Sequence, residues 1–544
     1  MPSDAPMFNL AWLHEAIAER VPERECLVFR DRRLSWSDVT ERTRRLAAVL
    51  RDAGLGCHRE RAELAGWESG QDHVALYLYN GNEYLEGMLG AFKARCVPVN
   101  VNYRYVEEEL VYLLRNAKVR AIVFHARFAP VLARIRAQLP DVRLWLRVED
   151  GSGESLPDTV DYEAALAGAK PTPPAGLSPD DLYVLYTGGT TGMPKGVLWR
   201  QEDVFRSAMY TRRVETPEEV VAGAERADLR ALPAPPFMHG AAHWAAFNMW
   251  SLGGTIVVQS HPDRLDPVDL WETVERERVT ALTIVGDAFG RPLVDELRSG
   301  RHDASSLRLL TSGGAILTAS TKRELHALLP GVRVLDALGS SESGSQASYA
   351  SDAEDAAQTG RFALAPDNLV LREDLSGPVA AGSGEVGWLA RSGRVPLGYL
   401  DDPEKTAATF PVIDGVRYAV PGDRAKLEAD GTLRLLGRDS VTINTGGEKV
   451  FAEEVEHALK HHPAVFDAVV VGTPHERWGQ QVTALVRLRD GESPSEEALL
   501  SVARAHVAPY KLPKRFVFVR EIQRSPSGKA DYRWAKATAL EEPG

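Results

Sequence analysis

The chain has 544 residues, of which 44% are hydrophobic and 26% charged, and its formal net charge is −12. This length exceeds the size at which one hydrophobic core usually stops growing, so we expect two or more domains. The acidic balance argues against a nucleic-acid partner, because proteins that bind a phosphate backbone normally need a basic surface.

The cysteine content and the N-terminal residues indicate in which compartment the protein is found. Cys26, Cys57 and Cys96 have no metal-ligand spacing, and so few cysteines favour a reduced, cytoplasmic protein. The start, MPSDAPMFNLAWLHEAIAER, lacks the basic cluster and apolar run of a signal peptide. Residues 231–262 contain no Asp, Glu, Lys or Arg and are long enough to cross a bilayer, but their prolines, paired glycines and histidines favour a buried substrate wall. Peripheral membrane contact and a homodimer stay open.

Short apolar runs alternate with amphipathic segments along most of the chain. The runs include 74–79, 119–124, 255–259 and 279–285, and residues 267–278 show helical periodicity. This alternation predicts α/β architecture in which helices cover β-sheets.

The pattern changes near residue 437. A turn-rich stretch is followed by a helical pattern and by three further strand patterns, which together suffice for a small α+β domain. We therefore predict domains at 1–438 and 439–544. Within the second, we expect Ser493 to cap a helix that ends near His506, with Pro494 at its first position and Glu496 completing a capping box.

The stretch LYTGGTTGMPKGV (185–197) predicts a strand that runs into a Gly/Thr loop. Backbone N–H groups of such a loop form an anion-binding concavity, to which threonine hydroxyls and Lys195 add donors and positive charge, so a triphosphate would suit it. The loop is not the common P-loop, because Pro194 precedes Lys195 and neither Ser nor Thr follows it. From these residues alone, a plain turn remains the alternative.

The sequence of this loop resembles the phosphate-loop signature of the adenylate-forming superfamily. This superfamily includes acyl-CoA synthetases, adenylation domains of peptide synthetases and luciferases. Further motifs resemble the family's in the same order and extend the resemblance from about residue 8 to 535: PPFMHG (235–240), SGGA (312–315), LGSSE (338–342), GD (422–423), GR (437–438) and SPSGK (525–529). The resemblance implies a large N-terminal domain of helix-covered β-sheets and a small, mobile α+β C-terminal domain.

The resemblance also implies the substrates and the site. ATP, Mg²⁺, coenzyme A and a carboxylic acid would bind, and the acid would be activated as an acyl-adenylate before a thiol attacks it. Phosphate contacts are implied for Thr187, Gly188, Gly189, Thr190, Thr191, Gly192 and Lys195; adenine and α-phosphate contacts for Gly313, Gly314, Ala315, Gly339, Ser340 and Ser341; ribose contacts for Asp423 and Arg438; and a pantetheine tunnel at Gly446, Gly447 and Glu448. The implied catalytic set is Thr187, His239, Glu342 and Lys529, with Glu342 as the Mg²⁺ ligand, since this ion prefers hard oxygen ligands.

Some positions depart from the family pattern or allow another interpretation. Leu338 replaces the usual tyrosine, so we expect aliphatic packing on the adenine, and Gly189 replaces a common serine. Ser440 stands at the hinge position, which is usually Asp or Lys. His239 lies on an apolar segment, where a hydrogen-bonded core histidine is the alternative.

Particular segments suggest the branch of the superfamily. NTGGEKVFAEE (444–454) resembles acyl-CoA synthetases, and YTGGTTGMPKGVLWRQEDVF (186–205) and GRDSVTINTGGEKVF (437–451) resemble the members that activate long-chain fatty acids or sterol side-chain acids. Residues 239–250 mix small alanines with Trp244, Phe247 and Trp250, as a roomy apolar cavity or any buried helix would. We therefore predict an acyl-CoA synthetase for an apolar acid. The alternatives are a ligase that loads a carrier protein and a non-catalytic nucleotide-binding protein.

Overall fold

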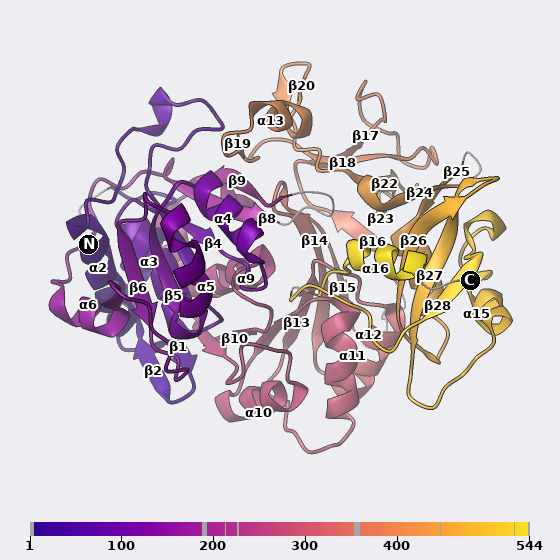
Figure 1. Cartoon of the computed structure of the whole chain (residues 1–544), viewed down its shortest axis with the longest axis horizontal. Helices are drawn as coiled ribbons and strands as arrows, with labels where there is room; N and C mark the ends of the chain where they lie inside the picture. Colours follow the sequence, from indigo (N-terminus) through magenta and orange to yellow (C-terminus); the bar gives the residue numbers. More distant parts are fainter. Residues whose placement is uncertain are drawn as a thin grey trace.

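The computed structural model describes residues 5–187, 193–210, 212, 214–225, 228–352, 360–445, 448–526 and 528–541. It confirms the α/β class: a large part built of helix-covered β-sheets is followed by a smaller part built around one mixed sheet. Figure 1 shows the first strands and helices (indigo) at one end of the molecule and the C-terminal sheet (yellow) at the other.

The largest sheet has 13 strands in the described part of the chain, and its central strands, from β14 to β1, run parallel. In spatial order the strands are β17 (Asn368–Leu371), β18 (Gly387–Arg391), β22 (Asp423–Leu427), β23 (Leu433–Arg438), β16 (Arg361–Leu364), β15 (Gly344–Ser351), β14 (Arg333–Ser340), β13 (Leu309–Gly313), β12 (Ala281–Ile284), β10 (Arg230–Pro233), β11 (Thr255–Val258), β1 (Glu25–Phe29) and β2 (Arg32–Ser35).

Smaller sheets flank this one. A parallel sheet comprises β4 (Val97–Asn100), β3 (His73–Tyr77), β5 (Val119–His125), β6 (Leu144–Val148) and β7 (Val160–Asp161). An antiparallel sheet comprises β19 (Gly398–Tyr399), β9 (Lys195–Arg200) and β8 (Leu182–Thr187), and β20 (Val412–Ile413) pairs with β21 (Val416–Arg417). The C-terminal sheet comprises β25 (Glu448–Phe451), β24 (Thr442–Thr445), β27 (Gly479–Leu488), β26 (Val465–His475) and β28 (Arg515–Phe518).

Helices cover these sheets. Those before residue 439 are α1 (Leu10–Arg20), α2 (Trp36–Asp52), α3 (Asn82–Lys93), α4 (Glu107–Asn116), α5 (Ala129–Ile135), α6 (Tyr162–Gly168), α7 (Gln201–Val204), α8 (Pro217–Ala224), α9 (Gly240–Ser251), α10 (Pro267–Glu277), α11 (Gly286–Leu297), α12 (Ala319–Leu328) and α13 (Pro403–Thr409). After it come α14 (Ala452–Leu459), α15 (Glu496–Ala503) and α16 (Tyr532–Glu541).

Local sequence explains where these helices begin. Helix α10 begins at Pro267, and the carboxylate of Asp266 accepts a hydrogen bond from the Asp269 backbone N–H, so the helical periodicity at 267–278 is confirmed. The capping prediction for α15 was wrong. Ser495, not Ser493, caps this helix by accepting from the Ala498 backbone N–H, and Glu496 is therefore the first helical residue rather than the third.

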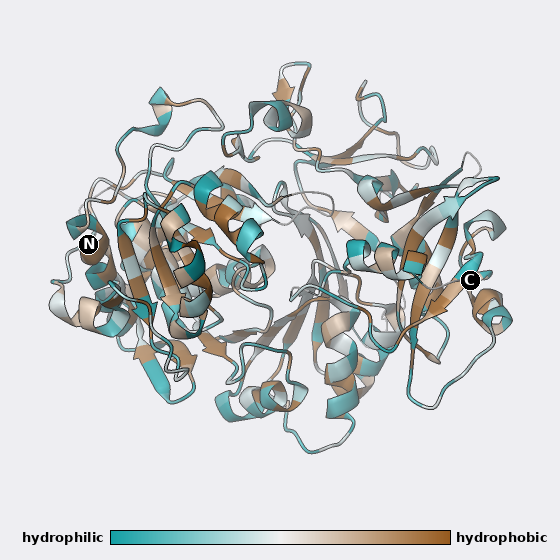
Figure 2. Ribbon diagram, in the orientation of Figure 1, coloured by the Kyte–Doolittle hydropathy of each residue, from teal (hydrophilic) through white to brown (hydrophobic). Residues whose placement is uncertain are grey.

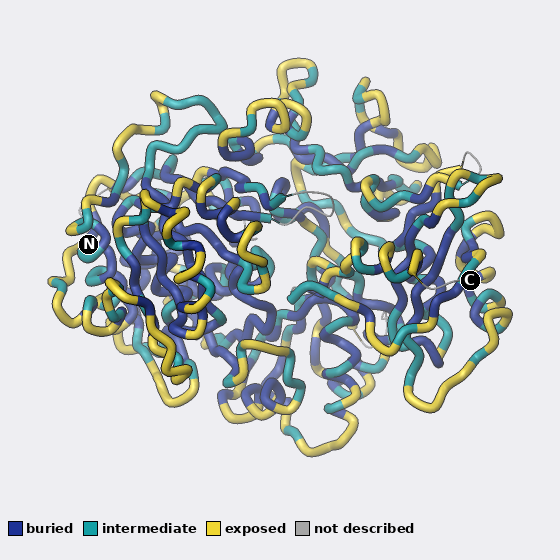
Figure 3. The backbone as a smooth tube through the Cα atoms, viewed as in Figure 1, coloured by how far each residue is buried: buried dark blue, intermediate teal, exposed yellow. Residues whose placement is uncertain are grey.

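The hydrophobic core follows the strands. Figure 2 shows brown, hydrophobic residues on the strands and teal residues on the outer faces of the helices, and Figure 3 shows the strands buried beneath exposed loops. The uncharged stretch 231–262 contains β10, α9 and β11, two short buried strands and one helix between them. In the described part of the chain, no helix has both the length and the apolar character that a membrane span needs.

Candidate active site

The predicted nucleotide residues gather where parallel strands end. Gly313 ends β13, Ser340 ends β14, and His239 follows β10, so all three lie at the carboxyl edge of the central sheet. Ligands of α/β sheets bind at this edge, because the loops there diverge and leave a crevice. A cavity of about 1520 Å³ opens here, and Thr187, His239, Gly313, Gly314, Gly339, Ser340, Ser341 and Lys529 line it.

The predicted phosphate loop connects two antiparallel strands, β8 and β9. Thr187 and Lys195 are paired in register across β8 and β9, so both lie next to this loop. The predicted contacts Gly188, Gly189, Thr190, Thr191 and Gly192 lie outside the described residues. Lys195 extends from the hairpin to within 5.7 Å of the Tyr399 ring centroid, measured from its Nζ atom. The lysine is thereby directed toward the turn that holds Glu342.

Glu342 lies in the turn between β14 and β15, and only 9% of its surface is exposed. The turn is held in place because Trp199 donates from Nε1 to the Ser341 carbonyl at 2.9 Å. The Tyr399 hydroxyl donates to Glu342 Oε1 at 3.1 Å, and burial together with the Glu342 charge raises the pKa of Tyr399. Tyr399 therefore stays protonated and orients the carboxylate. Sequence reasoning missed this residue.

The two residues predicted to bind the ribose, Asp423 and Arg438, lie side by side. Asp423 and Arg438 are paired in register across β22 and β23, and Arg438 Nε lies 3.3 Å from Asp423 Oδ1. The Asp423 charge is the main reason that the pKa of Arg438 is raised. Neither residue lines the cavity itself. Their charges instead influence the pKa of Lys529, which does line the cavity.

Lys529 reaches the cavity from the C-terminal part of the chain. In Figure 1 the yellow segment that precedes α16 runs from the C-terminal sheet to the middle of the molecule, beside β13 and β15. A Cβ placed on Gly314 would lie 4.0 Å from Lys529 Cε, so the lysine rests on the loop after β13. Desolvation and the nearby Arg438 lower the pKa of Lys529, while Glu342, Asp423 and Glu453 oppose that shift. The lysine is thus surrounded by the charges of the predicted site.

Several described residues of the predicted site do not line the cavity: Lys195, Ala315, Glu342, Asp423, Arg438 and Glu448. Ala315 packs toward Gly286 at the start of α11, where a Cβ on the glycine would lie 2.9 Å from the Ala315 Cβ, and Ala315 does not line the cavity. Glu448 is exposed on β25, which Figure 1 places at the outer side of the C-terminal sheet. Gly446 and Gly447 lie outside the described residues. The pantetheine role of this segment stays a prediction.

Glu453 is a second residue that sequence reasoning missed. It lies in the first turn of α14, and its Oε2 would be 3.2 Å from a Cβ placed on Gly437, so the carboxylate rests against β23 next to Arg438. Desolvation, followed by repulsion from Glu456 and Asp423, raises the pKa of Glu453 to about 7. Its sequence context, FAEEVE, resembles an ordinary exposed helix start.

We expect Glu453→Gln to stabilise the protein increasingly as pH rises from about 4.5 to about 7, with the full gain above pH 7. The folded state keeps the Glu453 proton up to about pH 7, whereas the unfolded chain releases it near 4.5, so wild-type stability falls as pH rises between these values. Glutamine does not ionise, so the variant does not lose stability in this pH range. Thermal unfolding should show a gain of about 2–4 °C at pH 8 and little change at pH 4. Glu492→Gln, on an exposed turn, is the control; a gain of equal size at both pH values would contradict the assignment.

His239 precedes α9 as its N-cap residue. Its Nε2 atom is buried and has no hydrogen-bond partner among the described residues. Desolvation and the Lys529 charge lower the pKa of His239 to about 3, so its imidazole is neutral at physiological pH. A neutral ring with an unpaired nitrogen can make one hydrogen bond to a bound ligand without adding charge. The core-histidine alternative requires a protein partner for that nitrogen, and the structure provides none among the described residues.

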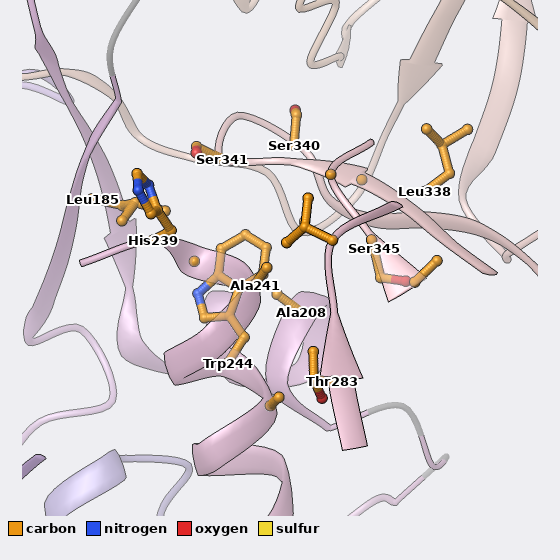
Figure 4. Close-up of a pocket in the computed structure, with 18 of the residues that line it drawn as sticks. Leu185, Ala208, His239, Ala241, Trp244, Thr283, Leu338, Ser340, Ser341 and Ser345 are labelled. Atoms are coloured by element: carbon orange, nitrogen blue, oxygen red, sulfur yellow. The ribbon is translucent and has the colours of Figure 1, made fainter. Parts of the chain in front are cut away.

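Helix α9 forms one wall of an apolar part of the cavity. Figure 4 shows the Trp244 indole projecting from this helix beside Ala241 and Ala208, with His239, Leu185 and Ser341 above it and Ser340 farther to the upper right. The small residues of the walls are Ala208, Ala241, Ala245, Ala281, Thr283 and Ala337, and Met249, Leu309 and Leu335 line the cavity as well. Phe247 and Trp250, also expected at the cavity, are instead buried in the core. Both interpretations of residues 239–250 thus hold, one for each face of α9.

The Trp244 indole is fixed by a chain of hydrogen bonds. Its Nε1 donates to the Tyr183 hydroxyl at 2.8 Å, and that hydroxyl is in turn bonded to His243 Nε2. His243 Nδ1 lies 2.7 Å from the Phe237 carbonyl and so carries the proton of a neutral imidazole, which leaves Nε2 to accept from Tyr183. The cavity wall at Trp244 is therefore rigid rather than adaptable.

Comparisons with known proteins agree with this geometry. The model of the AMP-binding enzyme family matches residues 14–400, and that of the AMP-binding enzyme C-terminal domain matches residues 454–529. Similar structures include the anthranilate CoA ligase AuaEII in complex with anthranoyl-AMP (TM-score 0.83, 23% identity, 99% of this chain and 98% of that chain) and ATP-bound MatB from Rhodopseudomonas palustris (TM-score 0.79, 24% identity, 97% and 99%).

Sequence relatives cover nearly the whole chain. A medium-chain acyl-CoA ligase, Mig, of Mycobacterium avium is 51% identical over 98% of both chains. A 3-oxocholest-4-en-26-oate–CoA ligase of Rhodococcus rhodochrous is 41% identical over 97% of this chain and 95% of its own. The fold and the site define a protein that brings a nucleotide and an apolar ligand together. The chain belongs to the AMP-binding enzyme family.

Proposed function

We propose that this protein is an AMP-forming acyl-CoA ligase for an apolar carboxylic acid. One observation carries the proposal: Lys529, from the C-terminal part of the chain, lines the same cavity as Thr187, Gly314 and His239, and that cavity continues into an apolar chamber. A carboxylate in the chamber and a triphosphate at the hairpin would meet at the lysine. The CoA ligases that are 51% and 41% identical support the same activity.

The first half-reaction joins the acid to AMP. A carboxylate oxygen attacks the α-phosphorus of ATP, the bond to the β-phosphate bridging oxygen breaks, and pyrophosphate leaves with that electron pair. Two anions must approach each other, so the site has to neutralise charge and fix geometry. We assign the neutralising charge to Lys529, the phosphate contacts to Thr187 and Lys195, and the ribose hydroxyls to Asp423, with Arg438 beside it. His239 would hydrogen-bond the acid through its unpaired Nε2.

Mg²⁺ fits the residues that are present. Glu342 offers a buried, oriented carboxylate, and Mg²⁺ in nucleotide sites typically takes one or two carboxylates and completes its shell with phosphate and water oxygens. When bound, the ion would offset phosphate charge during the displacement. The protein's own part is to hold Glu342 through Tyr399 and through the turn that Trp199 fixes.

The second half-reaction transfers the acyl group. The thiol of coenzyme A attacks the acyl carbon and loses its proton, and AMP leaves with the electron pair of the broken carbon–oxygen bond. We propose a domain boundary between Arg438 and Asp439 with the hinge near Ser440, dividing an N-terminal unit (residues 5–438) from a C-terminal unit (residues 439–541). Rotation of the C-terminal unit would withdraw Lys529 and bring the 446–448 segment toward the pantetheine.

Product analysis tests the proposal. The protein is incubated with ATP, Mg²⁺ and short, medium-chain, long-chain, aromatic or sterol side-chain acids, each with and without coenzyme A. We expect AMP, pyrophosphate and an acyl-CoA from medium-chain or bulkier apolar acids. An acyl-adenylate that never passes to coenzyme A would identify a carrier-protein ligase instead, and no AMP from any acid would identify a non-catalytic nucleotide-binding protein.

The size of the apolar chamber should determine which carboxylic acids the enzyme uses best. Ala241→Phe would place a phenyl ring in the cavity beside Trp244, and overpacking of this kind typically costs 1–3 kcal/mol, so we expect kcat/KM for long-chain or ring-bearing acids to fall about 10-fold or more. Short acids should be affected within about twofold, because the carboxylate end of the site is unchanged. Ala222→Phe, on an exposed position of α8, is the control. An equal loss for all acids would contradict this placement of the chamber.

A further inference from the structure

Helix α11 is the surface on which the C-terminal unit rests. Residues 288, 291 and 295 lie on one face of this helix, since they are three and four positions apart. A Cβ on Gly528 would lie 3.3 Å from Ala288 Cβ, Arg291 contacts the C-terminal sheet, and Asp295 Oδ2 lies 3.6 Å from Arg489 Nη1. One face of a helix in the N-terminal unit thus contacts the C-terminal unit at three successive points.

Arg291 makes the strongest of these contacts. Its Nη1 donates to the Val465 carbonyl at 2.7 Å and also to the Phe466 carbonyl, both at the start of β26. Asp287 faces it from one turn earlier, with Oδ2 3.3 Å from Arg291 Nε, and Asp287 is itself fixed because Thr318 donates to Oδ1 from its backbone N–H at 2.9 Å. Arg291 is only 5% exposed. This buried charged side chain thus contacts Asp287 of its own helix through Nε and the C-terminal unit through Nη1.

The same short segment of β26 holds the loop that carries Lys529. Asp467, the next residue after Phe466, accepts two hydrogen bonds from Arg524, from Nε at 2.7 Å and from Nη2 at 2.8 Å. Arg524 Nη1 then donates to the Gly528 carbonyl at 2.9 Å, directly before Lys529. Paired hydrogen bonds between arginine and a carboxylate fix orientation as well as distance. A continuous set of contacts therefore runs from α11 to the lysine.

We propose that Arg291 is a positioning residue for the adenylation step: by holding the start of β26 against α11, it keeps the C-terminal unit in the orientation that delivers Lys529 to the cavity. The inference rests on the proposed function. In the thioester step, for which the C-terminal unit must turn, these hydrogen bonds have to break. Arg291 therefore favours one orientation over the other, and its removal lowers the fraction of molecules in which Lys529 is in place.

The test separates the two half-reactions in the full chain. Arg291→Met keeps an unbranched, flexible side chain but removes the guanidinium donors, and hydrogen bonds to a charged group contribute about 1.5–3 kcal/mol. We expect acid-dependent exchange of pyrophosphate into ATP to fall about 10- to 100-fold, and thioester formation from preformed acyl-adenylate and coenzyme A to stay within about twofold of wild type. Arg291→Lys retains a charged donor and should recover part of the exchange rate.

Arg301→Met is the matched control, because Arg301 follows the same helix but pairs with Glu296 of the N-terminal unit. It should leave both half-reactions within about twofold of wild type. Arg291→Met should unfold at a lower temperature than the other two variants, because the buried Asp287 loses its charged partner, so all activities are compared well below that temperature. Equal losses in both half-reactions of Arg291→Met, or no loss in either while the wild type is active, would overturn the positioning role. A wild type that forms no acyl-CoA from any acid would instead overturn the proposed function.

Discussion

Lys529→Ala is expected to lower acyl-adenylate formation by about 100-fold or more, since the loss of one preorganised donor to a developing charge costs about 10²–10³ in rate. In the structure the lysine rests against Gly314 in the cavity, among the charges of Glu342, Asp423 and Arg438. No other lysine of the C-terminal unit lines this cavity among the described residues. Acid-dependent exchange of pyrophosphate into ATP measures the effect.

The second half-reaction supplies the contrast for Lys529→Ala. Thioester formation from preformed acyl-adenylate and coenzyme A should stay within about threefold of wild type, because the transfer to sulfur needs no approach of two anions. Lys536→Ala, on the exposed side of α16, is the matched control and should leave both reactions intact. If Lys529→Ala damaged both half-reactions equally, the lysine would have a structural role instead.

Glu342→Gln should also lower adenylation by about 100-fold, and it should raise the Mg²⁺ concentration that gives half-maximal rate. Glutamine fills the same space and can still accept from Tyr399, but it removes the negative charge from a buried turn. A neutral amide oxygen is a poorer ligand for a hard divalent cation than a carboxylate. The adenylation rate is measured across a Mg²⁺ series at fixed ATP.

The control for this variant is Glu404→Gln, on the exposed side of α13 close to Tyr399 in the sequence. It should behave as wild type at every Mg²⁺ concentration. A Glu342→Gln enzyme with a reduced maximal rate and an unchanged Mg²⁺ requirement would separate Glu342 from the metal and leave it a purely structural carboxylate.

Ordered motifs predicted some of the residues that line the cavity, among them Thr187, His239 and Lys529. The strand pattern before the Gly/Thr loop predicted that Thr187 ends a strand, whereas Gly313 and Ser340 were indicated only by their motifs. Gly313 and Ser340 end parallel strands and therefore meet at the carboxyl edge of the central sheet, while Thr187 ends a strand of an antiparallel hairpin. Fold class followed from the alternation of apolar runs with amphipathic segments. Strand patterns, helix patterns and motifs are each made of residues close together in the sequence, so they can be recognised without knowing the fold.

Residues that act through long-range pairing could not be found in this way. Tyr399 reaches Glu342 only because β19 pairs with β9, and nothing in its own neighbourhood indicates that partner. Glu453 and Arg291 look like ordinary charged residues of amphipathic helices until the C-terminal unit is placed against α11 and β23. The α15 cap failed for a different reason: two serines stand two positions apart, and only the backbone geometry selects Ser495.

The alanine-lined chamber constrains how this protein can evolve. Where Ala208, Ala241, Ala245, Ala281 and Ala337 form the walls, almost every substitution adds atoms, so drift at these positions narrows the range of acids. Trp244 is the largest side chain of the labelled wall, but its indole is tied to Tyr183 and His243, and its loss would leave a buried hydroxyl without its donor. Activity on larger acids would thus require several coupled substitutions, whereas a single substitution is enough to lose activity on the larger acids.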